Sequence, residues 1–184
     1  MTKKTMTDHP DRNAFLGEIV RDLAPRDLLE IGCGGGRFAK IITGSLPSVR
    51  YTGIDRSQLA IARCEQRNGR GIQEGRIRFL HGDFRSLPNE RPYDVCCAVN
   101  VNAFWTDPKV SFERARALLE DRGSLALAFE APSTERSQMI SDRLRTVEHN
   151  PFGLARQVWA DSRLFAMIFL AAAHPSSRGH SSTV

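Results

Sequence analysis

Residues 28–39 read Leu-Leu-Glu-Ile-Gly-Cys-Gly-Gly-Gly-Arg-Phe-Ala, and this stretch decides the fold. An apolar run ends at Ile31, glycine then occupies positions 32, 34 and 36, and a helical pattern begins after the last of them. Glycine adopts the backbone angles of a tight turn without strain and lets a ligand approach the main chain closely. The stretch therefore predicts a strand, a glycine loop and a helix, the unit that binds nucleoside-bearing ligands in α/β sheets.

The spacing of these glycines separates two kinds of cofactor. A dinucleotide fingerprint has the form Gly-x-Gly-x-x-Gly directly after the strand, and counted from Gly32 its last position is Arg37. Counted from Gly34, the looser form ending in alanine fits, but it begins too late for the tight turn at the strand end. A nicotinamide dinucleotide is thus disfavoured. An ordinary turn between strand and helix stays open as the plain alternative.

Two further expected strands end in carboxylates. Asp55 follows the strand 50–54, roughly 20 residues after the glycines, where folds of this kind hold the ribose hydroxyls of a nucleotide. Asp83 follows the strand 77–80, in the sequence Gly-Asp-Phe. A carboxylate accepts hydrogen bonds from hydroxyl and amino groups, which suits a nucleoside. The alternative is that Asp55 is only a turn residue and that Asp83 only caps the turn after it.

Five segments, in order, resemble the motifs of the class I S-adenosylmethionine-dependent methyltransferases that act on small molecules. They are the glycine stretch 30–36, the strand end at Asp55, Gly-Asp-Phe at 82–84, the segment 93–108 with its Val-Asn and Trp-Thr-Asp-Pro, and Leu-Leu-Glu-Asp-Arg-Gly-Ser-Leu at 118–125. In the last of these, Ser124 stands where a second glycine is common. The order of the five motifs carries the resemblance, since no single one is specific.

The resemblance implies roles for particular residues. In that family the acid after the second strand holds the cofactor ribose, the acid after the third accepts from the adenine amino group, and the next residue lies along the adenine ring. A loop after the fourth strand faces the sulfonium. The predicted cofactor-binding residues are therefore Glu30, Gly32, Cys33, Gly34, Gly36, Asp55, Arg56, Asp83, Phe84 and Asn100.

The same resemblance assigns the acceptor pocket to the loop 100–105. We expect Asn102 and Trp105 to contact the acceptor, although Trp105 is equally suited to packing the loop against the core. His149 precedes Asn-Pro in a loop that could reach the acceptor. His81 and His149 are the candidate bases, but a histidine at a strand end or in a loop is often an ordinary polar surface residue. No catalytic residue is therefore predicted.

The function implied is transfer of a methyl group from S-adenosylmethionine to a small molecule by in-line displacement. Positioning would supply most of the catalysis, with the acceptor atom held about 3 Å from the methyl carbon. The motifs of DNA, arginine and catechol-type methyltransferases are missing, so neither nucleic acid nor a metal is expected. Two alternatives stay open: a member of the same fold that binds the cofactor without methylating, for cyclisation or regulation, and an NAD-binding oxidoreductase.

Composition agrees with one globular domain. The chain has 184 residues, 41% of them hydrophobic. Its net charge is +5, and the basic residues are scattered along the sequence rather than gathered into one run. The four cysteines lack zinc-type spacing and are expected to be reduced thiols. The start of the chain shows no secretory signal, and the apolar run 164–173 is too short to span a bilayer, so a cytoplasmic location is expected. The short segment before the first strand leaves two alternatives for the acceptor site: it is open, or a second subunit closes it in a homodimer.

The alternation of strands and helices predicts an α/β fold, a Rossmann-like doubly wound sheet of seven strands in a three-layer α/β/α sandwich. All strands should be parallel except one, because the short turn 160–163 requires an antiparallel hairpin. Residues 13–174 form the predicted domain, between a loose segment 1–12 and a disordered tail 175–184. Strands are expected at 27–31, 50–54, 77–80, 94–99, 124–130, 155–159 and 164–172, and helices at 13–23, 36–44, 57–68, 108–119 and 133–148.

Overall fold

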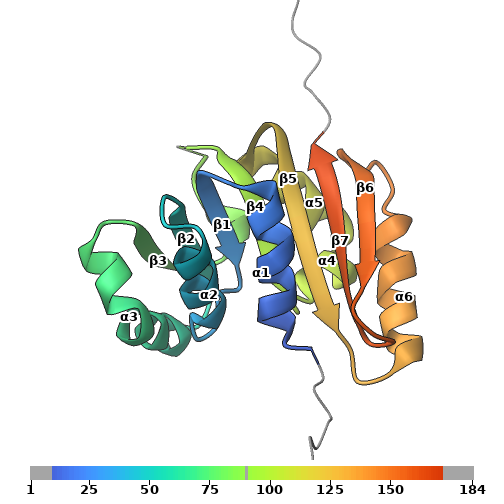
Figure 1. Cartoon of the computed structure of the whole chain (residues 1–184). Coiled ribbons are helices and arrows are strands. Elements are labelled where there is room, and N and C mark those ends of the chain that lie inside the picture. The colour runs from blue at the N-terminus through green and yellow to red at the C-terminus, as the bar shows by residue number, and fades with distance from the viewer. Residues whose placement is uncertain (1–9, 90, 172–184) are drawn as a thin grey trace, which may run out of the picture.

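A computed structural model describes residues 10–89 and 91–171, which form one sheet of seven strands with helices on both faces (Figure 1). The strand order is β3-β2-β1-β4-β5-β7-β6. The strands are β1 (Asp27–Ile31), β2 (Arg50–Asp55), β3 (Ile77–His81), β4 (Tyr93–Val99), β5 (Leu119–Glu130), β6 (Phe152–Trp159) and β7 (Leu164–Ala171). The helices are α1 (Arg12–Leu23), α2 (Arg37–Ser45), α3 (Gln58–Gln73), the 3-10 turn η1 (Phe84–Ser86), α4 (Ala103–Thr106), α5 (Pro108–Leu118) and α6 (Thr134–Arg145).

The predicted fold class is confirmed. Strands β1 to β5 are all parallel, and β7 runs antiparallel to both β5 and β6. After β1, the strands β2 and β3 are added on one side of it, and β4 and β5 are then added on its other side. The direction of strand addition therefore reverses between β1 and β4. In such sheets ligands bind at the carboxyl ends of the strands beside this reversal.

The two layers of helices pack on opposite faces of the sheet. Figure 1 shows α1 and α2 in front of the sheet and α4 and α5 behind it. Successive side chains of a strand point to opposite faces of the sheet, so each strand contributes apolar side chains to both layers. On β4, for example, Cys96 belongs to one hydrophobic cluster and Cys97 to the other. Both thiols are completely buried, one on each face of the sheet.

Several element boundaries differ from the prediction. Helix α1 starts at Arg12, one residue earlier than expected, where the Asp11 carboxylate caps it. Helix α3 continues past a kink at Asn68 to Gln73. Strand β5 starts at Leu119, which pairs with Tyr93 ahead of an irregularity in the ladder.

The last elements also shift. Helix α6 ends at Arg145, because Thr146 leaves helical backbone angles. Strand β6 begins at Phe152, earlier than expected, and has an irregularity between Leu154 and Arg156. Residues 1–9 of the predicted loose segment, the last residue of the predicted strand 164–172, and the predicted tail 175–184 lie outside the described residues.

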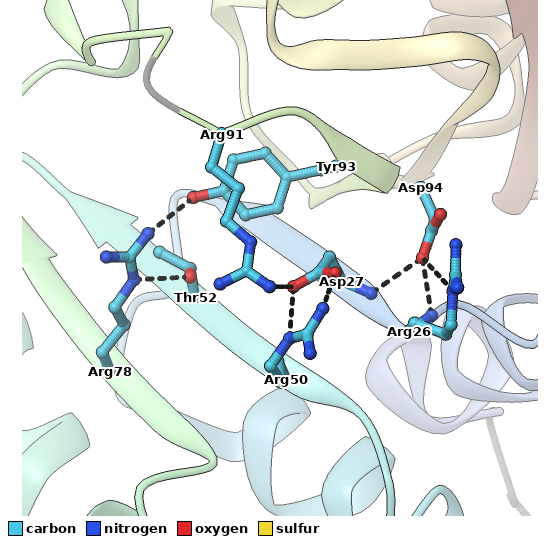
Figure 2. Close-up of polar contacts among 8 residues, drawn as sticks. All are labelled: Arg26, Asp27, Arg50, Thr52, Arg78, Arg91, Tyr93 and Asp94. Atoms are coloured by element: carbon cyan, nitrogen blue, oxygen red, sulfur yellow. Dashed lines mark hydrogen bonds and ion pairs between the residues drawn. The ribbon is translucent and has the colours of Figure 1, made fainter.

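Polar contacts join the amino-terminal ends of the first strands (Figure 2). Asp27 on β1 accepts hydrogen bonds from Arg50 on β2, one of them 2.7 Å long, and lies 3.1 Å from the guanidinium of Arg91. The hydrogen bond from Arg50 is the main reason why the pKa of Asp27 lies below its usual range. Nearby, Arg78 on β3 donates to the hydroxyl groups of Thr52 and Tyr93. These contacts bind four neighbouring strands at the end of the sheet remote from the expected ligand.

Phenylalanine side chains fill the layer behind the sheet. The Phe112 ring on α5 lies 5.1 Å from that of Phe169, 5.9 Å from Phe152 and 6.0 Å from Phe104, each in an edge-to-face arrangement. Phe112 is completely buried. Aromatic pairs at these distances add to the gain from burial alone. This ring therefore joins α4, α5, β6 and β7.

Replacing Phe112 with alanine tests this packing. We expect Phe112→Ala to lower the free energy of unfolding by about 3–5 kcal/mol, since the change removes a buried ring and leaves a cavity. Urea unfolding followed by circular dichroism measures it. The exposed Leu59, on the surface of α3, gives the control Leu59→Ala, which should change stability by less than about 0.5 kcal/mol. Equal effects of the two substitutions would contradict the packing described.

Candidate functional site

A cavity of about 310 Å³ opens at the carboxyl ends of β1, β2, β3 and β4. It lies where the strand order reverses, the position expected for a ligand in this class of sheet. Its size is at the lower end of small-molecule sites. The lining comes from four loops: Ile31 and Gly32; Ile54, Asp55 and Arg56; Gly82, Asp83, Phe84 and Arg85; Val99, Asn100, Val101, Asn102 and Ala103.

The glycine loop has left-handed backbone angles at Gly32, Gly34 and Gly36, with φ of 74°, 52° and 70°. A side chain at Gly32 would overlap Val101, 2.6 Å away, and one at Gly36 would overlap Asn68 at 2.5 Å. A side chain at Gly34 would meet nothing within 4 Å. Gly32 and Gly36 are therefore required by packing as well as by φ, whereas Gly34 borders open space.

Helix α3 holds the carbonyl groups of this loop. The thiol of Cys64 lies 3.1 Å from the Gly34 oxygen, Arg67 donates to the Gly35 oxygen at 2.6 Å, and Asn68 donates to the Gly36 oxygen at 3.1 Å. Positions 64, 67 and 68 share one face of a helix, so each of three successive loop carbonyls has its own side-chain partner on that face. We call Cys64, Arg67 and Asn68 the α3 clamp.

The α3 clamp was missed by the sequence analysis. Arg67 and Asn68 lie where the helix was expected to end, and polar residues there are ordinary at a solvated helix end. A usable signal was the spacing of these polar side chains on the helix that follows the Asp55 strand.

Asp55 joins the glycine loop to the second strand. One carboxylate oxygen accepts from the Gly34 amide at 2.9 Å, and the other accepts from the Ser57 amide, also at 2.9 Å. Each oxygen of an ionised carboxylate has capacity for a second donor. Asp55 and Arg56 both line the cavity, as predicted from their positions. Asp55 is thus a turn residue and also a free acceptor toward a ligand.

The third loop contains Asp83, Phe84 and Arg85. The Asp83 carboxylate caps η1 through the Arg85 amide and also accepts from the Arg85 guanidinium, at distances from 2.9 to 3.2 Å. This pairing, above all its hydrogen bonds, lowers the pKa of Asp83. Phe84 is buried and stacks on Phe104, with ring centroids 5.7 Å apart. Asp83 therefore both caps a turn and presents an ionised carboxylate at the cavity.

The loop after β4 forms the remaining wall. Asn100 has φ of 54°, and its side chain accepts from the Glu130 amide at 2.8 Å, which joins the ends of β4 and β5. Asn102 lines the cavity and accepts from the indole N–H of Trp105 at 3.2 Å. Trp105 itself lies beneath the Arg136 guanidinium, 4.8 Å from the ring centroid. Of the predicted acceptor residues in this loop, Asn102 reaches the cavity and Trp105 positions it.

Glu30 lies in the core and does not line the cavity. It is 2% exposed and accepts a hydrogen bond from the Tyr51 hydroxyl on β2. Burial raises the pKa of Glu30 to about 8, against a smaller lowering by the Tyr51 hydroxyl. Cys33 is buried as well, against Cys64. Glu30 thus joins β1 to β2, Cys33 packs against α3, and neither is among the residues that line the cavity.

The prediction for His149 is wrong. His149 precedes β6, whose first residue Phe152 pairs with Ala171 at the last position of β7. The other end of β7, Leu164, pairs with Glu130 at the edge that holds the cavity. Because β7 runs antiparallel to β5, His149 lies at the opposite edge of the sheet. The other histidine considered, His81, donates to the Arg56 carbonyl at 3.0 Å.

The described residues contain neither a cluster of metal-ligating side chains nor a helix able to cross a membrane. Among residues 10–89 and 91–171, no three His, Cys, Asp or Glu side chains gather as a metal site requires. Within the same ranges no helix has the length and apolar character needed to cross a membrane.

Alanine substitution in the glycine loop separates backbone strain from steric overlap. We expect Gly34→Ala to cost about 1–2 kcal/mol of unfolding free energy, the strain of a left-handed residue alone. Gly36→Ala should cost clearly more, because its Cβ would also press on buried Asn68 and on the Cys64 backbone at 3.0 Å. Urea unfolding of the two variants side by side measures the difference. Equal losses would show that the α3 clamp does not pack as described.

The raised pKa of Glu30 predicts a dependence of stability on pH. Between its ordinary value of 4.5 and about 8, the folded protein keeps a proton that the unfolded chain releases. The free energy of unfolding should therefore fall as pH rises through this range, by about 1.4 kcal/mol for each pH unit from this group. Glu30→Gln removes the titration and keeps an acceptor for Tyr51. Urea unfolding at pH 5 and pH 8 should show a smaller fall in Glu30→Gln, and identical falls would refute the assignment.

The comparisons with known proteins agree with this geometry. A family model described as a methyltransferase domain matches residues 28–123, just over half of the chain. The chain is 31% identical over 134 residues to a phthiotriol/phenolphthiotriol dimycocerosates methyltransferase 2 of Mycobacterium ulcerans, covering 70% of this chain and 50% of that protein. It is 32% identical over 95 residues to trans-aconitate 2-methyltransferase of Streptomyces avermitilis, covering 52% and 34%. The chain thus spans half or less of these curated relatives.

Solved structures share the fold. The N-methyltransferase NodS from Bradyrhizobium japonicum WM9 superposes with a TM-score of 0.67 at 18% identity, over 91% of this chain and 99% of that one. The same enzyme has been solved with S-adenosylhomocysteine, and that structure matches over 89% of each chain. With its matching domain, its relatives and its glycine loop at the switch in strand order, the chain belongs to the class I S-adenosylmethionine-dependent methyltransferases.

Proposed function

We propose that the protein transfers the methyl group of S-adenosylmethionine to a small-molecule acceptor by in-line displacement, catalysed mainly by positioning. The observation that carries the proposal is the cavity at the switch point, with Asp55 and Asp83 on its wall. Two carboxylates that accept hydrogen bonds, the ring of Phe84 and a main chain bare of side chain at Gly32 make a set of acceptors and apolar surface that fits a nucleoside. The residues present therefore fit this cofactor.

Asp55 is the residue proposed to bind the two ribose hydroxyls, since each of its oxygens has an unused acceptor position. The Asp83 carboxylate would accept from the adenine amino group, and Arg85 keeps that carboxylate ionised and fixes its orientation. Phe84 contributes an apolar wall against the base, held in place by its stacking on Phe104. Gly32 lets the main chain approach the ligand, because a side chain there is already excluded by Val101.

Bound S-adenosylmethionine supplies an electrophilic methyl group, so the chain needs no nucleophile of its own. The task left to the protein is to hold an acceptor lone pair in line with that methyl group and to exclude water. Asn100, Val101 and Asn102 line the side of the cavity proposed for the acceptor. The left-handed Asn100 is held by its bonds to the end of β5, and Asn102 by Trp105, so this wall is rigid before an acceptor arrives. We propose no general base.

The names of the relatives support a small acceptor in different ways. The Mycobacterium ulcerans protein is named for phthiotriol dimycocerosates and the Streptomyces avermitilis protein for trans-aconitate. The two names give different acceptors. They therefore support methyl transfer to a small molecule without indicating which one.

The proposal is tested by calorimetric titration of the purified protein with S-adenosylmethionine, S-adenosylhomocysteine and NADH. We expect the first two ligands to bind and NADH not to bind. Asp55→Ala should weaken binding by about a hundredfold or more, since hydrogen bonds to a charged group contribute about 1.5–3 kcal/mol each.

Asp22→Ala is the matched control, because Asp22 is an exposed carboxylate on α1 remote from the cavity lining. It should bind as the parent protein does. Thermal melts of both variants establish that they fold. Binding of NADH alone, or a folded Asp55→Ala protein with unchanged affinity, would overturn the proposed cofactor site.

A further inference from the structure

Two cysteines that the proposed reaction does not use lie together beneath the glycine loop. The sulfur atoms of Cys33, in the loop, and Cys64, on α3, are 3.7 Å apart, and both side chains are buried. The other cysteines of the described chain, Cys96 and Cys97, are adjacent on β4 and enter opposite layers of the core. Cys33 and Cys64 are therefore the pair placed for chemistry with each other.

The surroundings make the two thiols unequal. The contact with Cys33, and more weakly the charge of Arg67, lower the pKa of Cys64, while the same contact and burial raise the pKa of Cys33. Cys64 lies on the same helix face as the cation Arg67, which also contacts the glycine loop, so Cys64 is the thiol placed to react as the thiolate, the reactive form of cysteine. Its sulfur also lies 3.1 Å from the Gly34 carbonyl oxygen, as the first member of the α3 clamp.

A small oxidant has a short path to this pair. The layer over Cys64 is the main chain at Gly34, and a side chain added there would meet nothing within 4 Å. Gly34 and Gly35 have no side chains to block that approach, and both are only partly buried. The main chain that the Cys64 sulfur contacts at Gly34 therefore borders open space itself, which brings this pair close to a small oxidant outside the loop.

We propose that Cys33 and Cys64 are an oxidative modification site, at which hydrogen peroxide closes a disulfide that weakens cofactor binding. The Cys64 thiolate attacks one peroxide oxygen, the O–O bond breaks, and the leaving hydroxide takes up a proton, which gives a sulfenic acid and water. The Cys33 sulfur then displaces the hydroxyl group from Cys64 as a second water and loses its proton. In balance, two thiols and one peroxide give one disulfide and two waters.

The disulfide would disturb the loop that borders the cofactor cavity. Its sulfur atoms must come from 3.7 Å to about 2.05 Å, which moves Cys33 and α3 toward each other. Cys64 also loses the hydrogen that it offers to the Gly34 carbonyl. Gly34 in turn donates its amide to Asp55, so the displacement reaches the residue proposed to hold the ribose. This last consequence rests on the proposed function, whereas the disulfide itself does not.

The experiment treats the full chain with a small excess of hydrogen peroxide and maps its peptides without reduction by mass spectrometry. We expect a Cys33–Cys64 link. Calorimetry with S-adenosylhomocysteine should then show at least about tenfold weaker binding, restored by dithiothreitol. Cys64→Ser keeps a donor for the Gly34 carbonyl and should bind equally before and after peroxide. Cys33→Ser is the second variant if the first does not fold.

The control is Cys96→Ala, which leaves the pair intact and should respond to peroxide as the parent protein does. Absence of a Cys33–Cys64 link, or a linked protein with unchanged affinity, would overturn the proposal. If the reduced protein does not bind S-adenosylhomocysteine at all, the proposed function fails, and the peptide map still decides whether the pair is an oxidation site.

Discussion

The cofactor cavity depends on a backbone conformation that the glycine loop cannot stabilise alone. Three glycines with positive φ turn the chain sharply between β1 and α2. Buried main-chain carbonyls without partners are costly, so something outside the loop must satisfy them. The α3 clamp does so with one side chain for each of three successive carbonyls. Since α3 begins directly after β2, it also connects the loop to the strand that carries Asp55.

The carboxylates near the loop have different tasks because their surroundings differ. Glu30 is enclosed by the core, so its pKa rises and its role is to bind Tyr51 across two strands. Asp83 faces the cavity beside Arg85, so its pKa falls and it remains an acceptor. Asp55 combines both situations, because its carboxylate accepts from two backbone amides and also lines the cavity. Position relative to solvent, rather than residue type, separates an acid that serves the core from one that faces the cavity.

Much of the fold was predictable, because hydrophobic periodicity and turn residues are local signals. The alternation of strands and helices and the short turn 160–163 were enough to predict seven strands with one reversed. Boundaries failed where contacts distant in sequence extend an element. Leu119 joins β5 because Tyr93 lies opposite it, and α3 passes Asn68 because that side chain is bonded to the Gly36 carbonyl.

The sequence by itself determined the class of sheet, the glycine turn and the carboxylates at the ends of β2 and β3, since each of these is a short pattern of neighbouring residues. Only the tertiary structure decided which residues face the cavity. It placed Glu30 in the core, brought Cys64 from α3 against Cys33, and put His149 at the opposite edge of the sheet. These facts depend on strand direction and on the packing of segments far apart in the chain, and no local pattern encodes either.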